Sequence, residues 1–459
     1  MSRLYRLFAL SFALLFVSVS LAAEAVKPVK YVFLFIGDGM SIPQRMMTDE
    51  YLNKLGEPGL TLNTFPHQVM TTTRSSDSFI TDSAASGTAI ACGEKTNNGC
   101  IGVDAAGKRL ESTAEVARDA GRKVGIITSV TLNHATPAAF YGHNASRGSA
   151  YALGLDLIAS NFDFFAGGGI EKHNDTKADG YQGDIYDLAK EAGYFVTHDP
   201  DETMALAADS GKVIACLEDG SIPYAINHEP GLRIADYTKK AIELLDEDAG
   251  FFIMVEGGKI DWMCHANDAA TTMLEVIDMD AAVKVADAFA AQHADDTLIV
   301  VTGDHETGGL TLGFAGTGYQ SFIERLQYQT CSQEAFNEKL SKLAETKSAD
   351  FVFDDVKPLL TESFGLTFDE KEGPMKVTNG EAAELASAFD KAFGGEKKNP
   401  MALTVAAIRI FDNKAGLGWT SGAHTALPVN TSAKGPGSEL FEGMIDNTDV
   451  ARLLKQLVR

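Results

Sequence analysis

Short runs of mostly apolar residues divide the chain and predict buried β-strands. These runs occupy residues 31–36, 124–128, 251–255 and 298–301. Runs without polar alternation are typical of parallel strands that helices cover on both faces. The runs therefore predict a central sheet whose strands lie in the interior of the molecule.

Helical patterns stand between these runs. Ser112 and Glu115 have the spacing of a capping box, which opens a helix that ends near Gly121, shortly before the run at 124–128. The same order of helix, glycine and strand recurs at residues 185–196, and a longer helical pattern covers residues 271–291. Helices that alternate with buried strands predict an α/β fold, namely a large doubly wound, mostly parallel sheet with helices on both faces.

The pattern changes between residues 316 and 414. Phe336, Leu340 and Leu343 share one face of a helix, and Leu385 and Phe389 share another. We therefore expect a mainly helical insertion at about 316–414, within one domain that spans residues 26–459. The insertion is interpreted as a lid or a dimer surface that packs on the main sheet.

The first 25 residues have the features of a signal peptide. Arg3 and Arg6 precede an apolar stretch at 7–21, and small residues follow it. No later run is both long and apolar enough to span a bilayer. We therefore expect a periplasmic or secreted protein with no membrane span.

Acidic residues outnumber basic ones by 63 to 39, so that the formal charge is −24. A net charge of this sign argues against nucleic acid and anionic membrane surfaces as partners. An anionic substrate would need local positive charge, such as metal ions and an arginine. The five cysteines include no Cys-x-x-Cys pair, which argues against a zinc–thiolate framework. Cys92 and Cys100, which a short polar segment joins, are expected to form a disulfide in an oxidising compartment.

Carboxylates and histidines follow three of the predicted strands. Asp38 comes directly after the first run, Glu256 after the run at 251–255, and Asp304 with His305 after the run at 298–301. Parallel strands end at the same edge of a sheet, where α/β proteins bind their ligands, so we expect these side chains to meet. Each pattern alone is also compatible with an ordinary tight turn.

Asp261 and His265 are four residues apart, which places both on one face of a helical turn. A carboxylate and an imidazole in this position can hold one cation, whereas Glu256 is assigned to a different, harder ion. His424, among small residues, is a further candidate ligand. Mixtures of His and Asp suit zinc, and carboxylate and hydroxyl oxygens with water suit magnesium.

Three other residues complete the set. Ser83 lies near a predicted helix start, where it is either an N-cap or a nucleophile stabilised by free N–H groups. Thr136 precedes a proline, which holds it extended and fixes the direction of its hydroxyl. Arg147 is either a surface charge or a planar fork for two phosphate oxygens. A serine beside two metals and an arginine indicates phosphoryl transfer through a phosphoserine.

With these motifs in this order, the chain resembles the alkaline phosphatase family. The resemblance runs from residue 37 to residue 425, which is nearly the whole chain after the signal peptide. Each motif is short, and their combination is specific. The matching residues are Gly37-Asp38-Gly39, Thr81-Asp82-Ser83-Ala84, Ala135-Thr136-Pro137-Ala138, Ser146-Arg147, Glu256-Gly257-Gly258 with Asp261 and His265, Thr302-Gly303-Asp304-His305-Glu306, and Gly422-Ala423-His424-Thr425.

The resemblance implies two zinc ions and one magnesium ion per subunit, and a homodimer. It makes Ser83 the residue that becomes phosphorylated and Arg147 the residue that orients the phosphoryl group. The ligands implied for the first zinc are Asp261, His265 and His424. The ligands implied for the second zinc are Asp38, Asp304 and His305, and those implied for magnesium are Asp38, Thr136 and Glu256.

Two positions depart from the enterobacterial form of the family, which has Asp in place of His134 and Lys in place of Trp262. His134 cannot supply the same negative charge, which bears on magnesium affinity and on the pH optimum. Trp262 removes a positive charge from the phosphate site. Our hypothesis is that this change weakens the binding of product phosphate and speeds its release.

The function expected is a metal-dependent phosphate monoester hydrolase with a broad range of small-molecule substrates and an alkaline pH optimum. A phosphodiesterase or a sulfatase on the same scaffold is an alternative. Arg147 favours monoesters, and Ala84-Ala85-Ser86 after Ser83 lacks the Pro and Arg that mark formylglycine sites. A non-catalytic metal- or phosphate-binding protein is the third hypothesis, and the presence of Ser83 with every implied ligand argues against it.

Overall fold

A computed structural model describes residues 28–347, 350–369, 372–395 and 397–459. The signal peptide expected at residues 1–25 lies outside the described residues. Within the part of the chain that the structure describes, no helix combines the length and the apolar character needed to cross a membrane.

One sheet of ten strands organises the molecule, in the order β12-β2-β11-β8-β1-β7-β3-β4-β6-β5. The strands from β8 to β5 are parallel, whereas β11 pairs antiparallel with both β8 and β2. The predicted α/β fold with a mostly parallel sheet is confirmed. The strands are β1 Tyr31–Gly37, β2 His67–Thr72, β3 Lys123–Thr128, β4 Phe164–Gly167, β5 Tyr194–Thr197, β6 Lys212–Cys216, β7 Phe251–Gly257, β8 Thr297–Gly303, β11 Val429–Lys434 and β12 Met444–Asp446.

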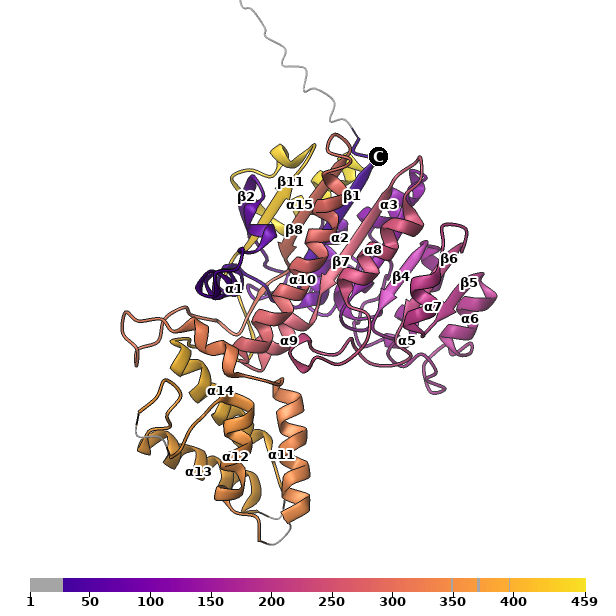
Figure 1. Cartoon of the computed structure of the whole chain (residues 1–459). Helices are drawn as coiled ribbons and strands as arrows, with labels where there is room; N and C mark the ends of the chain where they lie inside the picture. The colour runs from indigo at the N-terminus through magenta and orange to yellow at the C-terminus, as the bar shows by residue number, and fades with distance from the viewer. Residues whose placement is uncertain (1–27, 348–349, 370–371, 396) are drawn as a thin grey trace, which may run out of the picture.

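Helices cover both faces of this sheet (Figure 1). The side chains of β1 alternate between the faces, because successive residues of a strand point in opposite directions. Phe33 and Phe35 pack on one side with α8 and α10, and Leu34 packs on the other with α2, α3 and α15. The helices of the main part are α1 Ile42–Leu55, α2 Ser83–Cys92, α3 Thr113–Asp119, α4 Ala135–Ala138, α5 Ala150–Ser160, α6 Ile185–Glu191, α7 Pro200–Ala205, α8 Ile234–Leu245, α9 Lys259–His265, α10 Ala269–Ala290 and α15 Asn447–Leu457.

Local sequence signals set the ends of several helices. Ser112 Oγ accepts a hydrogen bond from Glu115 N–H, and the Glu115 carboxylate accepts one from Ser112 N–H, so the predicted capping box opens α3. Asp268 caps α10 by accepting from Thr271 N–H at 3.0 Å. The expected long helix therefore begins slightly earlier than the periodicity indicated.

A second group of helices lies beyond the carboxyl ends of the strands (Figure 1). Its buried residues, such as Phe336, Leu385 and Phe411, belong to a hydrophobic cluster that continues into the main part through α1, α9 and α10. Gln329 and Gln333 connect it to the main part, because both donate hydrogen bonds to the buried carboxylate of Asp268. These helices are α11 Gln333–Lys347, α12 Phe353–Phe364, α13 Asn379–Phe393 and α14 Met401–Ala415.

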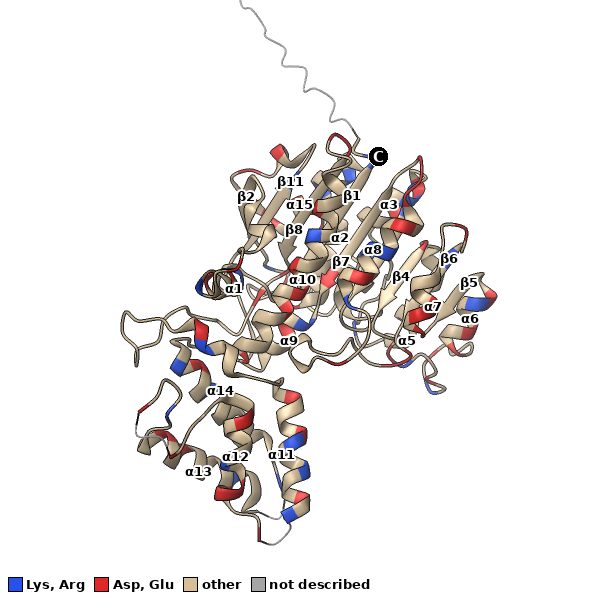
Figure 2. Ribbon diagram, in the orientation of Figure 1, with Lys and Arg blue, Asp and Glu red and all other residues tan. Residues whose placement is uncertain are grey.

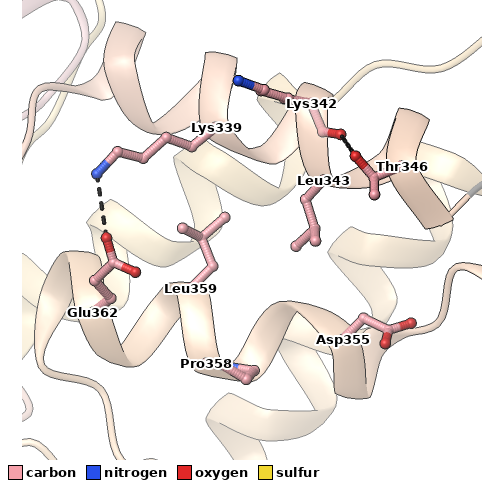
Figure 3. Close-up of a pocket in the computed structure, with 8 residues that line it drawn as sticks. All are labelled: Lys339, Lys342, Leu343, Thr346, Asp355, Pro358, Leu359 and Glu362. Carbon is pink, nitrogen blue, oxygen red and sulfur yellow. Dashed lines mark hydrogen bonds and ion pairs between the residues drawn. The ribbon is translucent and has the colours of Figure 1, made fainter.

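An open groove of about 480 Å³ lies between α11 and α12 (Figure 3). Leu343 and Leu359 point into it, and an ion pair of 3.5 Å joins Lys339 to Glu362 at one end. Charges of both signs are distributed along α11 (Figure 2). The groove lies within the helical group, and no candidate site residue lines it.

The predicted disulfide between Cys92 and Cys100 is wrong, since all five cysteines are free thiols. Cys92 ends α2 and turns its buried thiol toward the carbonyl of Ala139. Cys100 instead directs its thiol toward the carbonyl of Ala145. The two side chains therefore point to different neighbours, although the segment between them is short.

Candidate active site

The central strands end in register, which brings the predicted carboxylates together. Gly37 of β1 is paired with Gly257 of β7 and with Gly303 of β8. Asp38 and Asp304 directly follow the strands β1 and β8, and both are fully buried. Gly39 has a φ of +72°, and a Cβ there would lie 2.8 Å from the Cα of Asp261. Glycine therefore permits the loop after β1 to approach α9 closely.

The first cluster contains the three residues that were expected to share a zinc ion. His265 Nε2 lies 3.3 Å from Asp261 Oδ2 and 3.1 Å from His424 Nε2. His424 Nε2 lies 3.5 Å from Asp261 Oδ1. The ring of His305 stacks on that of His424 at 3.6 Å, so His305 lies beside this cluster as well.

Backbone carbonyls fix the orientation of two of these imidazoles. His265 Nδ1 donates to the carbonyl of Gly422 at 2.7 Å, and His424 Nδ1 donates to the carbonyl of Thr81 at 2.9 Å. Because Nδ1 carries the proton, the Nε2 lone pairs face each other and the carboxylate of Asp261. This is the arrangement in which histidines bind a metal.

The second cluster consists of Asp38, Asp304 and His305, all fully buried. His305 Nε2 lies 3.3 Å from Asp38 Oδ1 and 3.2 Å from Asp304 Oδ2. Ser83 Oγ lies 3.2 Å from the same nitrogen. The two carboxylates and the serine hydroxyl therefore lie around His305 Nε2.

The third cluster joins Asp38 to Glu256, Thr136 and a residue that was not predicted as a ligand, His134. Asp38 Oδ1, His134 Nδ1 and Glu256 Oε1 are buried and have no hydrogen-bond partner. His134 Nδ1 lies 3.9 Å from Glu256 Oε1, and Thr136 Oγ1 lies 3.4 Å from Asp38 Oδ2. Buried polar atoms are normally satisfied, so the unpaired atoms of His134 and Glu256, which face each other beside Asp38, fit a cation.

His134 holds the N-cap position of α4, from which its ring reaches Glu256. Burial, with the charge of Arg147 adding to it, lowers the pKa of His134 to about 4. The neutral ring can therefore act as a ligand. From the sequence, His134 was interpreted only as the loss of the negative charge that Asp carries in the enterobacterial form. Its proximity to Thr136, two residues away, was the available signal for a direct contact.

Burial dominates the ionisation of the carboxyl groups. It raises the pKa of Asp304 to about 7 and that of Glu256 to about 8, and neighbouring carboxylates add to both shifts. The pKa of Asp38 is raised well above its usual value by burial and by Asp304. Asp261 differs, since the imidazoles around it outweigh its burial and hold its pKa below the usual range. Positive charge is what such a group of buried carboxylates requires.

Ser83 is the first residue of α2, and Asp82 is its N-cap. Asp82 Oδ1 accepts a hydrogen bond from Ala85 N–H at 3.0 Å, so the aspartate, and not Ser83, caps the helix. Arg147 Nη1 donates to Asp82 Oδ2 at 3.1 Å, and its Nη2 lies 3.3 Å from His134 Nε2. The guanidinium therefore faces the accessible side of the acidic clusters, where an anion can bind.

Buried polar side chains that were not predicted support the clusters. Thr307 Oγ1 donates to Asp261 Oδ1 at 2.6 Å. Glu306, fully buried, accepts from Gln44 Nε2 at 3.0 Å and from the hydroxyl of Thr425. Since the short strands β9 (Glu306–Thr307) and β10 (His424–Thr425) pair with each other, these contacts hold His305 and His424 side by side.

Comparisons with known proteins agree with this geometry. A model of the alkaline phosphatase family matches residues 29–459. Alkaline phosphatase 4 of Bacillus subtilis (strain 168) is 33% identical over 455 residues, which cover 94% of this chain and 89% of that protein. A cold-active alkaline phosphatase from a psychrophilic Shewanella sp. has a TM-score of 0.79 and 28% identity, covering 94% of this chain and all (100%) of that one.

The alkaline phosphatase of Thermus thermophilus gives a TM-score of 0.78 at 26% identity, covering 95% of this chain and 93% of that chain. The matches extend over the sheet, the three clusters and the helical group together. The chain therefore belongs to the alkaline phosphatase family, and it is a phosphatase.

Proposed function

We propose that the protein hydrolyses phosphate monoesters through a phosphoserine at Ser83, with a broad substrate range and an alkaline pH optimum. The observation that carries the proposal is the position of Ser83 Oγ. It lies 3.2 Å from His305 Nε2, beside Asp38 and Asp304, at the start of a helix whose N–H groups favour an anion.

The proposed cofactors are two zinc ions and one magnesium ion per subunit. Asp261, His265 and His424 would hold one zinc, Asp38, Asp304 and His305 the other, and Asp38, Thr136 and Glu256 the magnesium. When bound, the ions supply Lewis acidity and lower the pKa of coordinated oxygens. The unpaired atoms of His134 and Glu256 support a cation there, and the imidazole of His134 is a nitrogen donor that suits zinc or cobalt better than magnesium.

A relative bears on that third site. The solved structure of a TAB5 alkaline phosphatase variant with a histidine replaced by aspartate is described as having Mg bound in its M3 site. That protein is 26% identical to this chain with a TM-score of 0.66, covering 94% of this chain and 99% of that chain. We propose that His134 has the corresponding place here and that it makes the site less selective for magnesium.

The residues of the chain divide the reaction between them. Ser83 Oγ attacks phosphorus and displaces the alcohol, and water then cleaves the serine ester and releases phosphate. Arg147, whose fork already contacts Asp82 and lies near His134, binds equatorial phosphoryl oxygens. A group with two or more free oxygens offers the guanidinium a bidentate contact, which supports monoesters as substrates.

We further propose that the protein is exported to the periplasm or secreted, and that it is a homodimer. The charge pattern at residues 1–25 supports export. Family membership supports the dimer. The helical segment at about 316–414 is proposed as an insertion in the single domain of residues 26–459.

The test is hydrolysis of p-nitrophenyl phosphate at alkaline pH by wild type, Ser83→Ala and Ser341→Ala. Ser341 is a matched control, because its hydroxyl bonds only within α11, to the carbonyl of Asn337. Each protein is assayed before and after chelation, and again with zinc and magnesium restored. We expect Ser83→Ala to lose about a thousandfold or more in kcat and Ser341→Ala to retain activity.

Chelation should abolish wild-type activity, and the metals should restore it. If the metal-loaded wild type leaves the monoester intact but cleaves a phosphodiester or a sulfate ester, the proposed substrate class is wrong. If Ser83→Ala is as active as the wild type, the phosphoserine intermediate is wrong.

A further inference from the structure

A cleft of about 450 Å³ separates α9 from α14 of the helical group, next to the candidate active site. Trp262, Met263 and His265 line it from α9, and Met401 and Val405 line it from α14. Val405 is 48% exposed, on the outward face of a helix whose other side packs into a core. The cleft therefore has apolar side chains on both of these helices, together with polar ones from Asn267, Gln333 and Glu334, and it begins at a candidate ligand of the first cluster.

A second hollow of about 350 Å³ continues from the first on the other side of Val405. Both share Ala266, Asn267 and Val405, and the second is also lined by Trp419 and Phe314. Together they form a continuous path from His265 along α14. Among the described residues that line the part next to His265, none is a lysine or an arginine, whereas Arg409 and Asp412 line the second hollow.

The burial of the site determines from which side a substrate enters. Ser83, Asp304 and His305 are buried, whereas the side chains of Arg147 and His265 are 36% and 39% exposed. Since Arg147 is assigned to the phosphoryl oxygens, the exposed side chain of His265 marks a direction in which the rest of the substrate can extend. In-line displacement also places the leaving oxygen opposite the nucleophile.

The order of the rings supports this direction. Ser83 contacts His305, the His305 ring stacks on His424, and His424 Nε2 is 3.1 Å from His265 Nε2. His265 is thus at the far end of the row from Ser83. Trp262 lines the cleft together with His265, so it would contact atoms attached to the leaving oxygen.

We propose that this cleft binds the alcohol part of the substrate and that, within a broad range of monoesters, it favours apolar alkyl or aryl groups. The proposal rests on the proposed monoester hydrolysis and adds the substrate class to it. The indole of Trp262, the thioethers of the two methionines and the side chain of Val405 make the burial of apolar groups favourable. The one acid in the lining, Glu334, accepts from the hydroxyl of Tyr224 at 3.0 Å and disfavours additional negative charge in the leaving group.

The experiment uses ethyl, butyl and hexyl phosphate, whose leaving alcohols have nearly the same basicity and differ in apolar length. Full burial of a methylene corresponds to about a fourfold gain, so half-burial in an open cleft predicts a rise in kcat/KM of about twofold per methylene. Inhibition constants of the matching alkylphosphonates, which cannot be hydrolysed, should follow the same series and report binding without chemistry.

The test variant is Met401→Gln with Val405→Thr, which keeps the size of both side chains and makes the wall polar. We expect the chain-length dependence to become nearly flat, with kcat/KM for hexyl phosphate falling toward the value for ethyl phosphate. Val352→Thr is the matched control, because Val352 is 54% exposed on the same helical group but does not line the cleft.

The outcomes separate the two proposals. If the wild type hydrolyses ethyl phosphate but its kcat/KM does not rise with chain length, the cleft does not bind the alcohol part. The proposed monoester hydrolysis would stand. The same holds if the double variant keeps the full wild-type series. If no alkyl phosphate is hydrolysed and no alkylphosphonate binds, the proposed function is wrong, and so is the proposed role of the cleft.

Discussion

Replacing Glu306 by glutamine tests whether a buried carboxylate that touches no substrate sets the position of the metal clusters. Glu306 Oε1 accepts from Gln44 Nε2 at 3.0 Å and from Leu310 N–H at 3.2 Å. Its Oε2 accepts from Gly309 N–H at 3.1 Å and from the Thr425 hydroxyl. All four partners are donors, so the side chain must present two acceptor oxygens.

Glutamine keeps the shape but presents an NH₂ group at one end. With its carbonyl toward Gln44, its NH₂ group faces Gly309 N–H, which loses its acceptor, while the Thr425 hydroxyl can rotate to accept. One unpaired buried donor costs about 1–3 kcal/mol, and the remaining bonds lose the strength of a charged acceptor. We expect Glu306→Gln to lower the free energy of unfolding by about 3 kcal/mol.

The altered contact loosens β9 against β10, and therefore His305 against His424. We expect zinc affinity to fall about tenfold to a hundredfold, as when the partners behind metal ligands are removed. Urea unfolding of the metal-free protein measures the first effect, and competition for zinc with a chromophoric chelator measures the second. Glu439→Gln, at an exposed position, is the control. Wild-type stability together with wild-type zinc affinity in Glu306→Gln would refute the reasoning.

Three further predictions concern single side chains. Trp262→Lys restores a positive charge near the phosphate site, so phosphate should inhibit about tenfold more strongly; unchanged inhibition would contradict our account of product release. His134→Asp replaces a nitrogen donor of the third cluster by a carboxylate, and calorimetry should show tighter magnesium binding than in the wild type. Equal magnesium affinity would exclude His134 from that site. Burial, with the charge of Asp278, raises the pKa of Glu275 to about 7, above the value near 4.3 of an unfolded chain. The folded protein therefore keeps a proton that the unfolded chain releases, and stability falls as pH rises through this window. Glu275→Gln should lose less stability than wild type between pH 5 and pH 8 in urea titrations, and parallel curves would show that Glu275 does not titrate in this range.

Uninterrupted runs of apolar residues made the central strands of the sheet predictable from the sequence. β1, β7 and β8 are fully buried along their length, so their sequences contain little else than apolar residues, and the carboxylates that follow them mark the functional edge. The strand β11 was not predicted, because its buried positions include polar side chains that bond to other polar groups and do not form an apolar run. Thr431 bonds to the hydroxyls of Thr71 and Thr302 at 2.7 Å each, so a polar sequence fills the interior of the sheet.

At the site, too, the sequence predicted local patterns but not contacts between residues that are distant in the sequence. Ligands that follow strands or share a helical turn were found from spacing. Gln44 and Thr307 were not, because their partners lie 262 and 46 residues away in the sequence. Apart from its position two residues before Thr136, nothing in the sequence marked His134 as a ligand. The disulfide prediction failed for a similar reason, since loop length does not determine where the Cys92 thiol points.

The helical group leaves and re-enters the main part at neighbouring points. Thr311 and Gly418 form a two-residue antiparallel bridge with hydrogen bonds of 2.7 and 3.1 Å, directly beyond the paired β9 and β10. A segment clamped at its base can change in length or content at little entropic cost to its surroundings. The bridge therefore helps to keep His305 and His424 together when the chain between them varies. Evolution, or a protein engineer, can exchange the wall that faces the leaving group while the catalytic chemistry is inherited unchanged.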